Sequence, residues 1–122
     1  MHIYIHVPFC ARRCSYCDFA IAVRRQVPSD EFARAVIGEW ERWLAHPSWV
    51  DAPVVDTIYF GGGTPSRLDP AAVAAILDRI RSDRPIAAGA EVTLEANPDD
   101  VDAERAAAWR QAGVNRVSLG VQ

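Results

Sequence analysis

Short segments in which apolar residues alternate with polar ones recur along the chain, separated by longer segments with a helical repeat. HIYIHV (2–7) is rich in β-branched residues and ends at Pro8, which predicts a strand that runs into a loop. The same signals predict three further strands: VVDTIYF (54–60), EVTLEANP (91–98) and RVSLGVQ (116–122). The chain is therefore expected to contain four strands.

Three intervening segments carry apolar residues at helical spacing. Ser29 is the expected N-cap of the first helix, whose apolar face comprises Phe32, Val36, Trp40, Trp43 and Leu44. Asp69 and Pro70 are expected to open the second helix, whose apolar face comprises Val73, Ile76, Leu77 and Ile80. Asp102 is expected to cap the third helix, which Gly113 ends in a left-handed turn.

The order of these elements is βαβαβαβ in one domain, with residues 46–53 expected to form a loop. Strands that alternate with helices imply a parallel sheet, either open or closed into a barrel. Side-chain alternation distinguishes the two, because neighbouring residues of a strand point to opposite faces. One face is apolar and is expected to meet the helices: Ile3, Ile5, Val7, Ile58, Phe60, Val92, Leu94, Val117, Leu119 and Val121. The other face is polar: Tyr4, His6, Thr57, Tyr59, Thr93, Glu95, Asn97, Ser118, Gly120 and Gln122.

A polar face favours the barrel, because the strands of an open doubly wound sheet are apolar on both faces. The expected fold class is thus α/β, a parallel β/α barrel. Its reactive end would be the C-terminal ends of the strands, where the cysteine segment, GGGTP and EANP lie. Four strands cannot close a barrel. Residues 1–122 are therefore expected to be the N-terminal portion of a longer chain, an incomplete barrel with open edges that is not stable alone.

Composition narrows the class of ligand. The chain has 13 basic and 16 acidic residues among 122, a formal net charge of −3, so its charge does not favour nucleic acid or an anionic membrane as a partner. No apolar segment approaches the roughly 20 residues that span a bilayer, and MHIYIHVPFC lacks the features of a signal peptide. We expect a cytoplasmic protein, without a transmembrane segment, that binds small ligands.

All the cysteines lie in one short segment, as Cys10, Cys14 and Cys17, with the spacing C-x-x-x-C-x-x-C. Cytoplasmic thiols stay reduced and their number here is odd, which argues against a disulfide framework. One interpretation is a zinc ion, with a fourth ligand from His2, His6 or Asp18. The other is a [4Fe–4S] cluster held by three thiolates, with one iron open to a substrate. Zinc motifs usually carry C-x-x-C pairs separated by longer spans, which favours the cluster.

The segment C-x-x-x-C-x-Y-C, preceded by a strand tyrosine and followed by GGGTP, resembles the radical S-adenosylmethionine (SAM) superfamily, whose fold is a partial or full parallel β/α barrel. More specifically, IYIHVPFCARRCSYCDF, YFGGGTPS, EVTLEANPD and AGVNRVSLGVQ are similar to the oxygen-independent coproporphyrinogen III oxidase family. These motifs occur in the same order and span essentially the whole chain.

The resemblance implies that Cys10, Cys14 and Cys17 ligate a [4Fe–4S] cluster whose open iron chelates the methionine part of SAM. An electron passed through the cluster would break the sulfonium C–S bond and yield a 5′-deoxyadenosyl radical. Such a reduction needs the low end of the potentials that these clusters span. The protein would orient the cofactor and exclude water and oxygen.

The resemblance also implies a set of SAM contacts: Tyr4, Tyr16, Gly62, Gly63, Thr64, Glu95 and Gln122. Tyr16 would pack against adenine. The glycine turn would receive the methionyl amino group and carboxylate, with N–H groups free to bind the carboxylate. Glu95 is expected to have a partner, because an unpaired buried carboxylate is costly. His6, on the polar face, is either a proton donor or a hydrogen-bonding residue beside the cluster.

Two branches of the family remain open. The oxidases decarboxylate two propionates of coproporphyrinogen III and typically carry a further cysteine in C-G-C, where this chain has Cys17, Asp18 and Phe19. C-D-F, GGGTPS and EANP resemble instead the heme chaperone branch, HemW, which binds heme and delivers it to hemoproteins. A chaperone implies heme or a porphyrin, an electron donor for the cluster and an acceptor hemoprotein as partners. Oxidase activity is the alternative.

Overall fold

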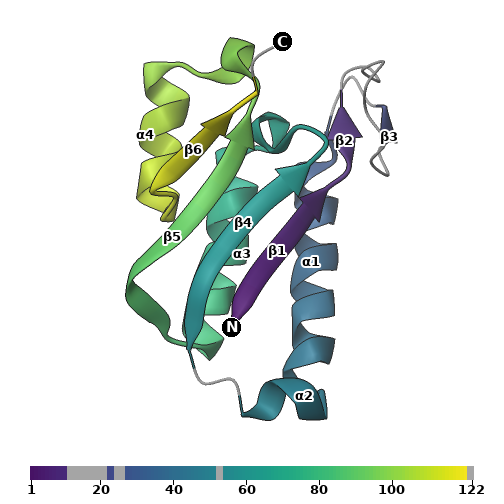
Figure 1. The fold of residues 1–122 in the computed structure, drawn as a ribbon. Coiled ribbons are helices and arrows are strands. Elements are labelled where there is room, and N and C mark those ends of the chain that lie inside the picture. The colour runs from purple at the N-terminus through teal and green to yellow at the C-terminus, as the bar shows by residue number, and fades with distance from the viewer. Residues whose placement is uncertain (11–21, 24–26, 52–53, 121–122) are drawn as a thin grey trace.

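The structure is a computed structural model that describes residues 1–10, 22–23, 27–51 and 54–120. Its centre is a four-stranded parallel sheet with the strand order β1-β4-β5-β6 (Figure 1). The strands are β1 (His2–Val7), β4 (Val55–Gly62), β5 (Ile86–Ala96) and β6 (Arg116–Leu119). All four point in the same direction, so their C-terminal ends lie at one edge of the sheet, uppermost in Figure 1.

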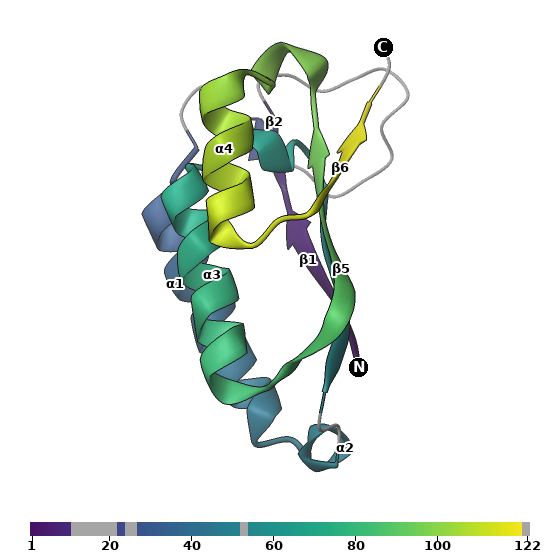
Figure 2. The same ribbon diagram turned by 90° about the vertical axis from the view of Figure 1, so that its left-hand side faces the viewer.

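The long helices α1 (Ser29–Leu44), α3 (Pro70–Asp83) and α4 (Ala103–Ala112) lie on the same side of the sheet (Figure 2). The described part of the chain places no helix on the opposite side. The order and the parallel sheet confirm the predicted α/β class. No helix among the described residues is both long and apolar enough to cross a membrane.

Short elements that the sequence pattern does not predict lie between the main ones. Two strands of two residues each, β2 (Phe9–Cys10) and β3 (Ala22–Val23), pair in parallel as a separate sheet. The helix α2 (Pro47–Val50) occupies part of the region expected to be a loop. The 3₁₀-helices η1 (Pro65–Arg67) and η2 (Pro98–Asp100) follow β4 and β5. Each is too short to show a period in the sequence.

The expected N-cap of the first helix is wrong by one residue. Pro28 is the N-cap, because its carbonyl oxygen accepts the first helical hydrogen bond, from Phe32 (2.9 Å). The Ser29 hydroxyl accepts instead from the N–H of Asp69 (3.0 Å), which ties the start of α1 to the start of α3. Asp69 itself caps α3 as predicted, through the N–H of Ala71 (3.0 Å).

The boundaries of the last helix are confirmed. The Asp102 carboxylate accepts from the N–H of Arg105 (2.7 Å) at the start of α4. Gly113 follows the helix with φ = +117°, and its N–H donates to the carbonyl oxygens of Trp109 and Arg110. A left-handed backbone of this kind favours glycine.

The register of the sheet confirms most of the predicted faces. Ile5, Phe60 and Leu94 align across three strands and are buried against the helices, whereas Tyr4 aligns with Tyr59 on the opposite face. Three residues within the strands differ from expectation. Val117 and Leu119 are 41% and 54% exposed, because β6 is the edge strand and no described helix covers its end. Thr93 is buried on the polar face, where it accepts a hydrogen bond from Arg116 (3.4 Å).

Candidate functional site

The C-terminal edge of the sheet brings together residues that are far apart in the sequence. The predicted ligand residues found there are Tyr4, Cys10, Gly62, Gly63, Thr64 and Glu95. Cys14, Tyr16, Cys17 and Gln122 lie outside the described residues, so their roles stay predictions.

The turn after β4 is docked on the segment that leads to the cysteines. Gly62 has φ = +110°, a conformation that side chains rarely adopt. The N–H of Gly63 donates to the carbonyl oxygen of Val7 (2.6 Å), and the N–H of Thr64 donates to that of Phe9 (2.9 Å). These two bonds fix the turn against β1 and β2.

The glycines of this turn are required because neighbouring groups fill the space where a Cβ atom would lie. A Cβ at Gly61 would contact the Glu95 carboxylate and lie 2.7 Å from the Tyr4 hydroxyl oxygen. A Cβ at Gly63 would lie 3.0 Å from the sulfur of Cys10. The glycines thus allow a carboxylate, a phenol and a thiol to gather around one stretch of backbone.

The expectation that the turn offers free N–H groups to a carboxylate is wrong. The N–H of Gly62 donates to Glu95 Oε1 (3.1 Å), and those of Gly63 and Thr64 donate to β1 and β2. A turn that packs against two other segments satisfies its backbone donors within the protein. A ligand carboxylate must therefore find its donors elsewhere.

Glu95 has the partner that its position requires. It is half-buried near the end of β5, and one of its oxygens accepts the hydrogen bond from Gly62. The partner that the structure shows is a backbone N–H. No described residue hydrogen-bonds to the other carboxylate oxygen, which leaves an acceptor beside the glycine turn.

Tyr4 lies on the helix-free face and is 57% exposed. Its ring stacks on that of Tyr59, with centroids 5.8 Å apart and planes 12° apart, and the His6 ring lies 6.4 Å away. Partial burial, followed by the charge of Glu95 and by Tyr59, raises the pKa of the Tyr4 hydroxyl above its ordinary value. Tyr59 was not among the predicted ligands, although the strand alternation placed it on this face.

Cys10 lies in β2, a short strand rather than the expected loop, and its side chain is buried. The hydroxyl of Thr64 donates a hydrogen bond to its sulfur, with Oγ1 and Sγ 3.7 Å apart. This thiol is thus linked directly to the turn after β4.

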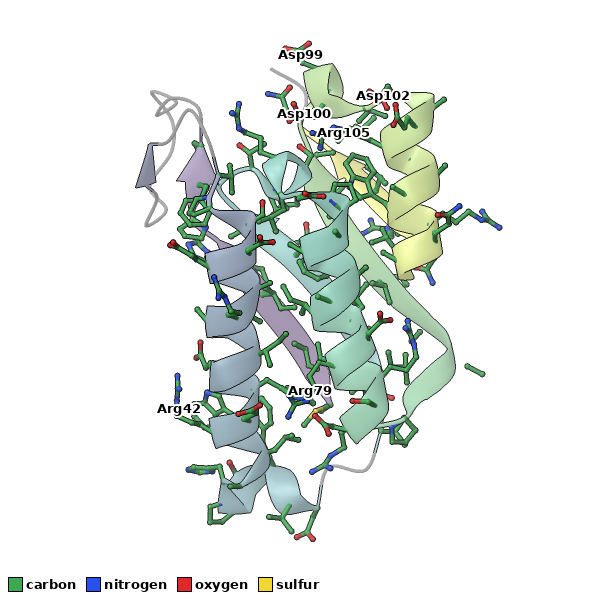
Figure 3. The ribbon with its side chains drawn as sticks, turned by 180° about the vertical axis from the view of Figure 1, so that it is seen from behind. Arg42, Arg79, Asp99, Asp100, Asp102 and Arg105 are labelled. Atoms are coloured by element: carbon green, nitrogen blue, oxygen red, sulfur yellow. The ribbon has the colours of Figure 1, made fainter. Side chains whose placement is uncertain are left out.

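Ser66 is a buried residue beside the glycine turn that sequence reasoning missed. It is fully buried, and its hydroxyl donates to the Asp100 carboxylate (2.8 Å) and accepts from the N–H of Asn97 (3.0 Å). Its carbonyl oxygen accepts from Arg105 (2.7 Å). Figure 3 shows Asp100 and Arg105 close together at this end of the molecule. Ser66 therefore ties the glycine turn to the segment after β5.

Asn97 was expected on the polar face of the sheet. This expectation is wrong, because β5 ends before Asn97. Its side chain accepts from the N–H of Asp99 (3.3 Å) and caps η2.

Comparison with known proteins assigns the chain to a family. The model of the radical SAM superfamily matches residues 4–122. A solved structure described as "Coproporphyrinogen III oxidase (HemN) from Escherichia coli is a Radical SAM enzyme" superposes with a TM-score of 0.84 at 29% identity. The superposition covers 99% of this chain and 27% of that one.

Several curated relatives are more similar in sequence. The chain is 42% identical over 123 residues to the heme chaperone HemW of Escherichia coli, which covers 100% of this chain and 32% of the relative. It is 45% identical over 123 residues to HemW of Mycobacterium tuberculosis, and the match covers 98% of this chain and 31% of that relative. It is 42% identical over 120 residues to the mitochondrial radical S-adenosyl methionine domain-containing protein 1 of Mus musculus, and the match covers 98% of this chain and 26% of that relative. The chain thus spans about a third of the length of these relatives, or less.

Proposed function

Because the chain belongs to the radical SAM superfamily, we propose that the C-terminal edge of its sheet holds a [4Fe–4S] cluster and SAM. Cys10, Cys14 and Cys17 would ligate three irons and leave the fourth to SAM. When bound, these groups supply one-electron chemistry that protein side chains lack.

The chemistry of the described donors fits such a cluster. Cys10 supplies a buried sulfur, and sulfur is the ligand that iron–sulfur clusters prefer. The Thr64 hydroxyl lies within hydrogen-bonding distance of that sulfur, as an outer partner of a metal ligand should. The glycines of the turn leave the space next to the sulfur open, since a Cβ at Gly63 would be only 3.0 Å from it.

The same edge supports the proposed SAM contacts. Glu95 keeps one oxygen beside the glycine turn that could accept from ribose hydroxyls or an ammonium group. Tyr4 presents an exposed ring on the helix-free face, held by its stacking on Tyr59. Gly62, Gly63 and Thr64 would shape the backbone around the methionine part, and Tyr16 and Gln122 would complete the contacts.

We further propose that residues 1–122 form the N-terminal portion of a radical SAM core, whose polar face lines the interior of an incomplete barrel. The helix-free face of the sheet and the greater length of the relatives support this proposal. A structure of the protein expressed from its complete gene tests it. The expected result is that further strands continue the sheet beyond β6; a helix packed on Tyr4 and Tyr59 would contradict it.

For the whole protein we propose a HemW-type heme chaperone, which carries heme to an acceptor hemoprotein in the cytoplasm and takes electrons for the cluster from a separate donor. The observation that carries this proposal is sequence identity: 42% and 45% to two proteins named heme chaperone HemW, against 29% to the protein named coproporphyrinogen III oxidase. The structural likeness to that oxidase supports the second candidate, oxidative decarboxylation of coproporphyrinogen III.

Two measurements under anaerobic conditions test these proposals. Metal analysis should find about four irons per chain and little zinc, with a brown colour that the Cys14→Ala variant loses. Zinc at one per chain would refute the cluster. The protein incubated with heme should retain it and should release no CO₂ from coproporphyrinogen III in the presence of SAM and a reductant. CO₂ release without heme retention would favour the oxidase.

A further inference from the structure

The side chain of Thr64 is held beside the sulfur of Cys10. The two backbone hydrogen bonds from Gly63 and Thr64 to Val7 and Phe9 fix the turn at this place. Thr64 Oγ1 then lies 3.7 Å from Cys10 Sγ, in a partly buried contact. The main-chain bonds therefore fix the backbone that carries the hydroxyl beside this sulfur.

The Thr64 hydroxyl does not serve the role that threonine usually has at this position. Thr64 is the N-cap of η1, where a threonine side chain commonly accepts a hydrogen bond from a backbone N–H of the first turn. Here the side chain makes no such bond. The Thr64 hydroxyl donates to the sulfur of Cys10 instead. This indicates that the side chain serves the contact with the sulfur and not the capping of the short helix.

We propose that Thr64 is a positioning residue that hydrogen-bonds to the Cys10 thiolate and makes the bound cluster easier to reduce. The inference rests on the proposed function, because it requires a cluster at Cys10. Reduction adds negative charge to the cluster, and part of that charge resides on its sulfur ligands. A hydroxyl that donates to one of these sulfurs stabilises the reduced form more than the oxidised form.

The test compares two substitutions in the protein expressed from its complete gene. Thr64→Val replaces the hydroxyl by a methyl group of similar size, and Thr64→Ser keeps the hydroxyl. A mediated reductive titration followed by electron paramagnetic resonance gives the midpoint potential of each. We expect a shift to more negative potential in Thr64→Val and little shift in Thr64→Ser. Resonance Raman spectra should show a change in an iron–thiolate stretching frequency in Thr64→Val alone.

The outcomes separate this inference from the proposed function. Absence of iron from the unaltered protein would overturn both. A cluster in all variants with equal midpoint potentials would overturn the role of Thr64 and leave the cluster proposal intact. If Thr64→Val does not retain the cluster, Thr64→Ala, which adds no bulk, carries the same expectation. An unaltered potential in Thr64→Ala would equally refute the inference.

Discussion

Glu95 and Gly62 are joined by a hydrogen bond of 3.1 Å from the backbone N–H of the glycine to a carboxylate oxygen. The bond links the end of β5 to the last residue of β4 across a sequence separation of 33 residues. It also holds a negative charge near the Tyr4 hydroxyl, where that charge adds to partial burial in raising the pKa of the phenol.

The substitution Glu95→Gln should lower the pKa of Tyr4 toward the ordinary tyrosine value of about 10. The amide keeps an oxygen for the Gly62 N–H but removes the charge that disfavours the phenolate. Phenolate absorbance in an alkaline titration measures the change, with Tyr4→Phe used to identify the contribution of this residue. A Tyr4 transition that stays in place would show that partial burial and Tyr59 raise the pKa without a contribution from Glu95.

The substitution Gly63→Ala should displace β2, which carries Cys10, and should reduce iron binding. The new Cβ would lie 2.7 Å and 2.9 Å from the carbonyl oxygens of Phe9 and Val7, and backbone atoms cannot move aside as a flexible side chain can. Gly38→Ala is the matched control, because its Cβ meets only Arg42 at 3.7 Å inside α1. The control should keep its iron and gain up to about 1 kcal/mol of stability. Normal iron content in Gly63→Ala would contradict the tight fit.

The substitution Ser66→Ala should lower the free energy of unfolding by about 1–3 kcal/mol, because it leaves the partly buried N–H of Asn97 and the Asp100 carboxylate without their shared partner. Urea unfolding measures the loss. Ser82→Ala provides the comparison: that exposed hydroxyl donates to the Arg79 carbonyl oxygen, and its removal should cost less than about 0.5 kcal/mol. Equal losses would mean that the Ser66 hydrogen bonds add nothing beyond a surface contact.

Acid should weaken the contact between α1 and α3. The Asp83 carboxylate accepts from the Trp40 indole N–H (2.9 Å) and from Arg79 (2.8 Å), and these bonds lower the pKa of Asp83. A lowered pKa means that the carboxylate contributes stability at neutral pH and loses that contribution as the pH falls through its folded-state pKa, below the usual Asp value near 4.

Trp40→Phe should therefore destabilise the protein by about 1–3 kcal/mol at neutral pH, and the difference from the unaltered protein should narrow in strong acid. Unfolding at a series of pH values measures this. The control is Trp43→Phe, which loses a longer, exposed bond to Glu39 (3.4 Å). A difference that is independent of pH would assign the Trp40 effect to packing alone.

The main elements and the two faces of the sheet could be predicted because they follow from local pattern. Alternation in HIYIHV and VVDTIYF put Tyr4 and Tyr59 on the same face, and the observed register agrees. The caps at Asp69 and Asp102 were equally local. Exposure of Leu119 could not be predicted in this way, since it depends on which helix covers the edge strand.

The parts of the site that sequence reasoning missed depend on long-range pairing. Nothing near Ser66 shows that its hydroxyl meets Asn97 and Asp100, more than 30 residues away. The donors of the glycine turn looked free because their acceptors, Val7 and Phe9, belong to a different segment. Candidate residues follow from motifs, whereas their mutual hydrogen bonds follow only from the tertiary fold.

The glycine turn is docked on the end of β1 through Gly63 and on β2 through Thr64, which joins the turn and the segment that leads to the cysteines into a single mechanical unit. A ligand that orders one of them lowers the entropic cost of ordering the other. Cluster binding at Cys10 and binding of the methionine part of SAM at the turn, as proposed above, would then be energetically coupled, and the coupling would be reciprocal: whatever factor the cluster adds to the affinity for SAM, SAM adds to retention of the cluster.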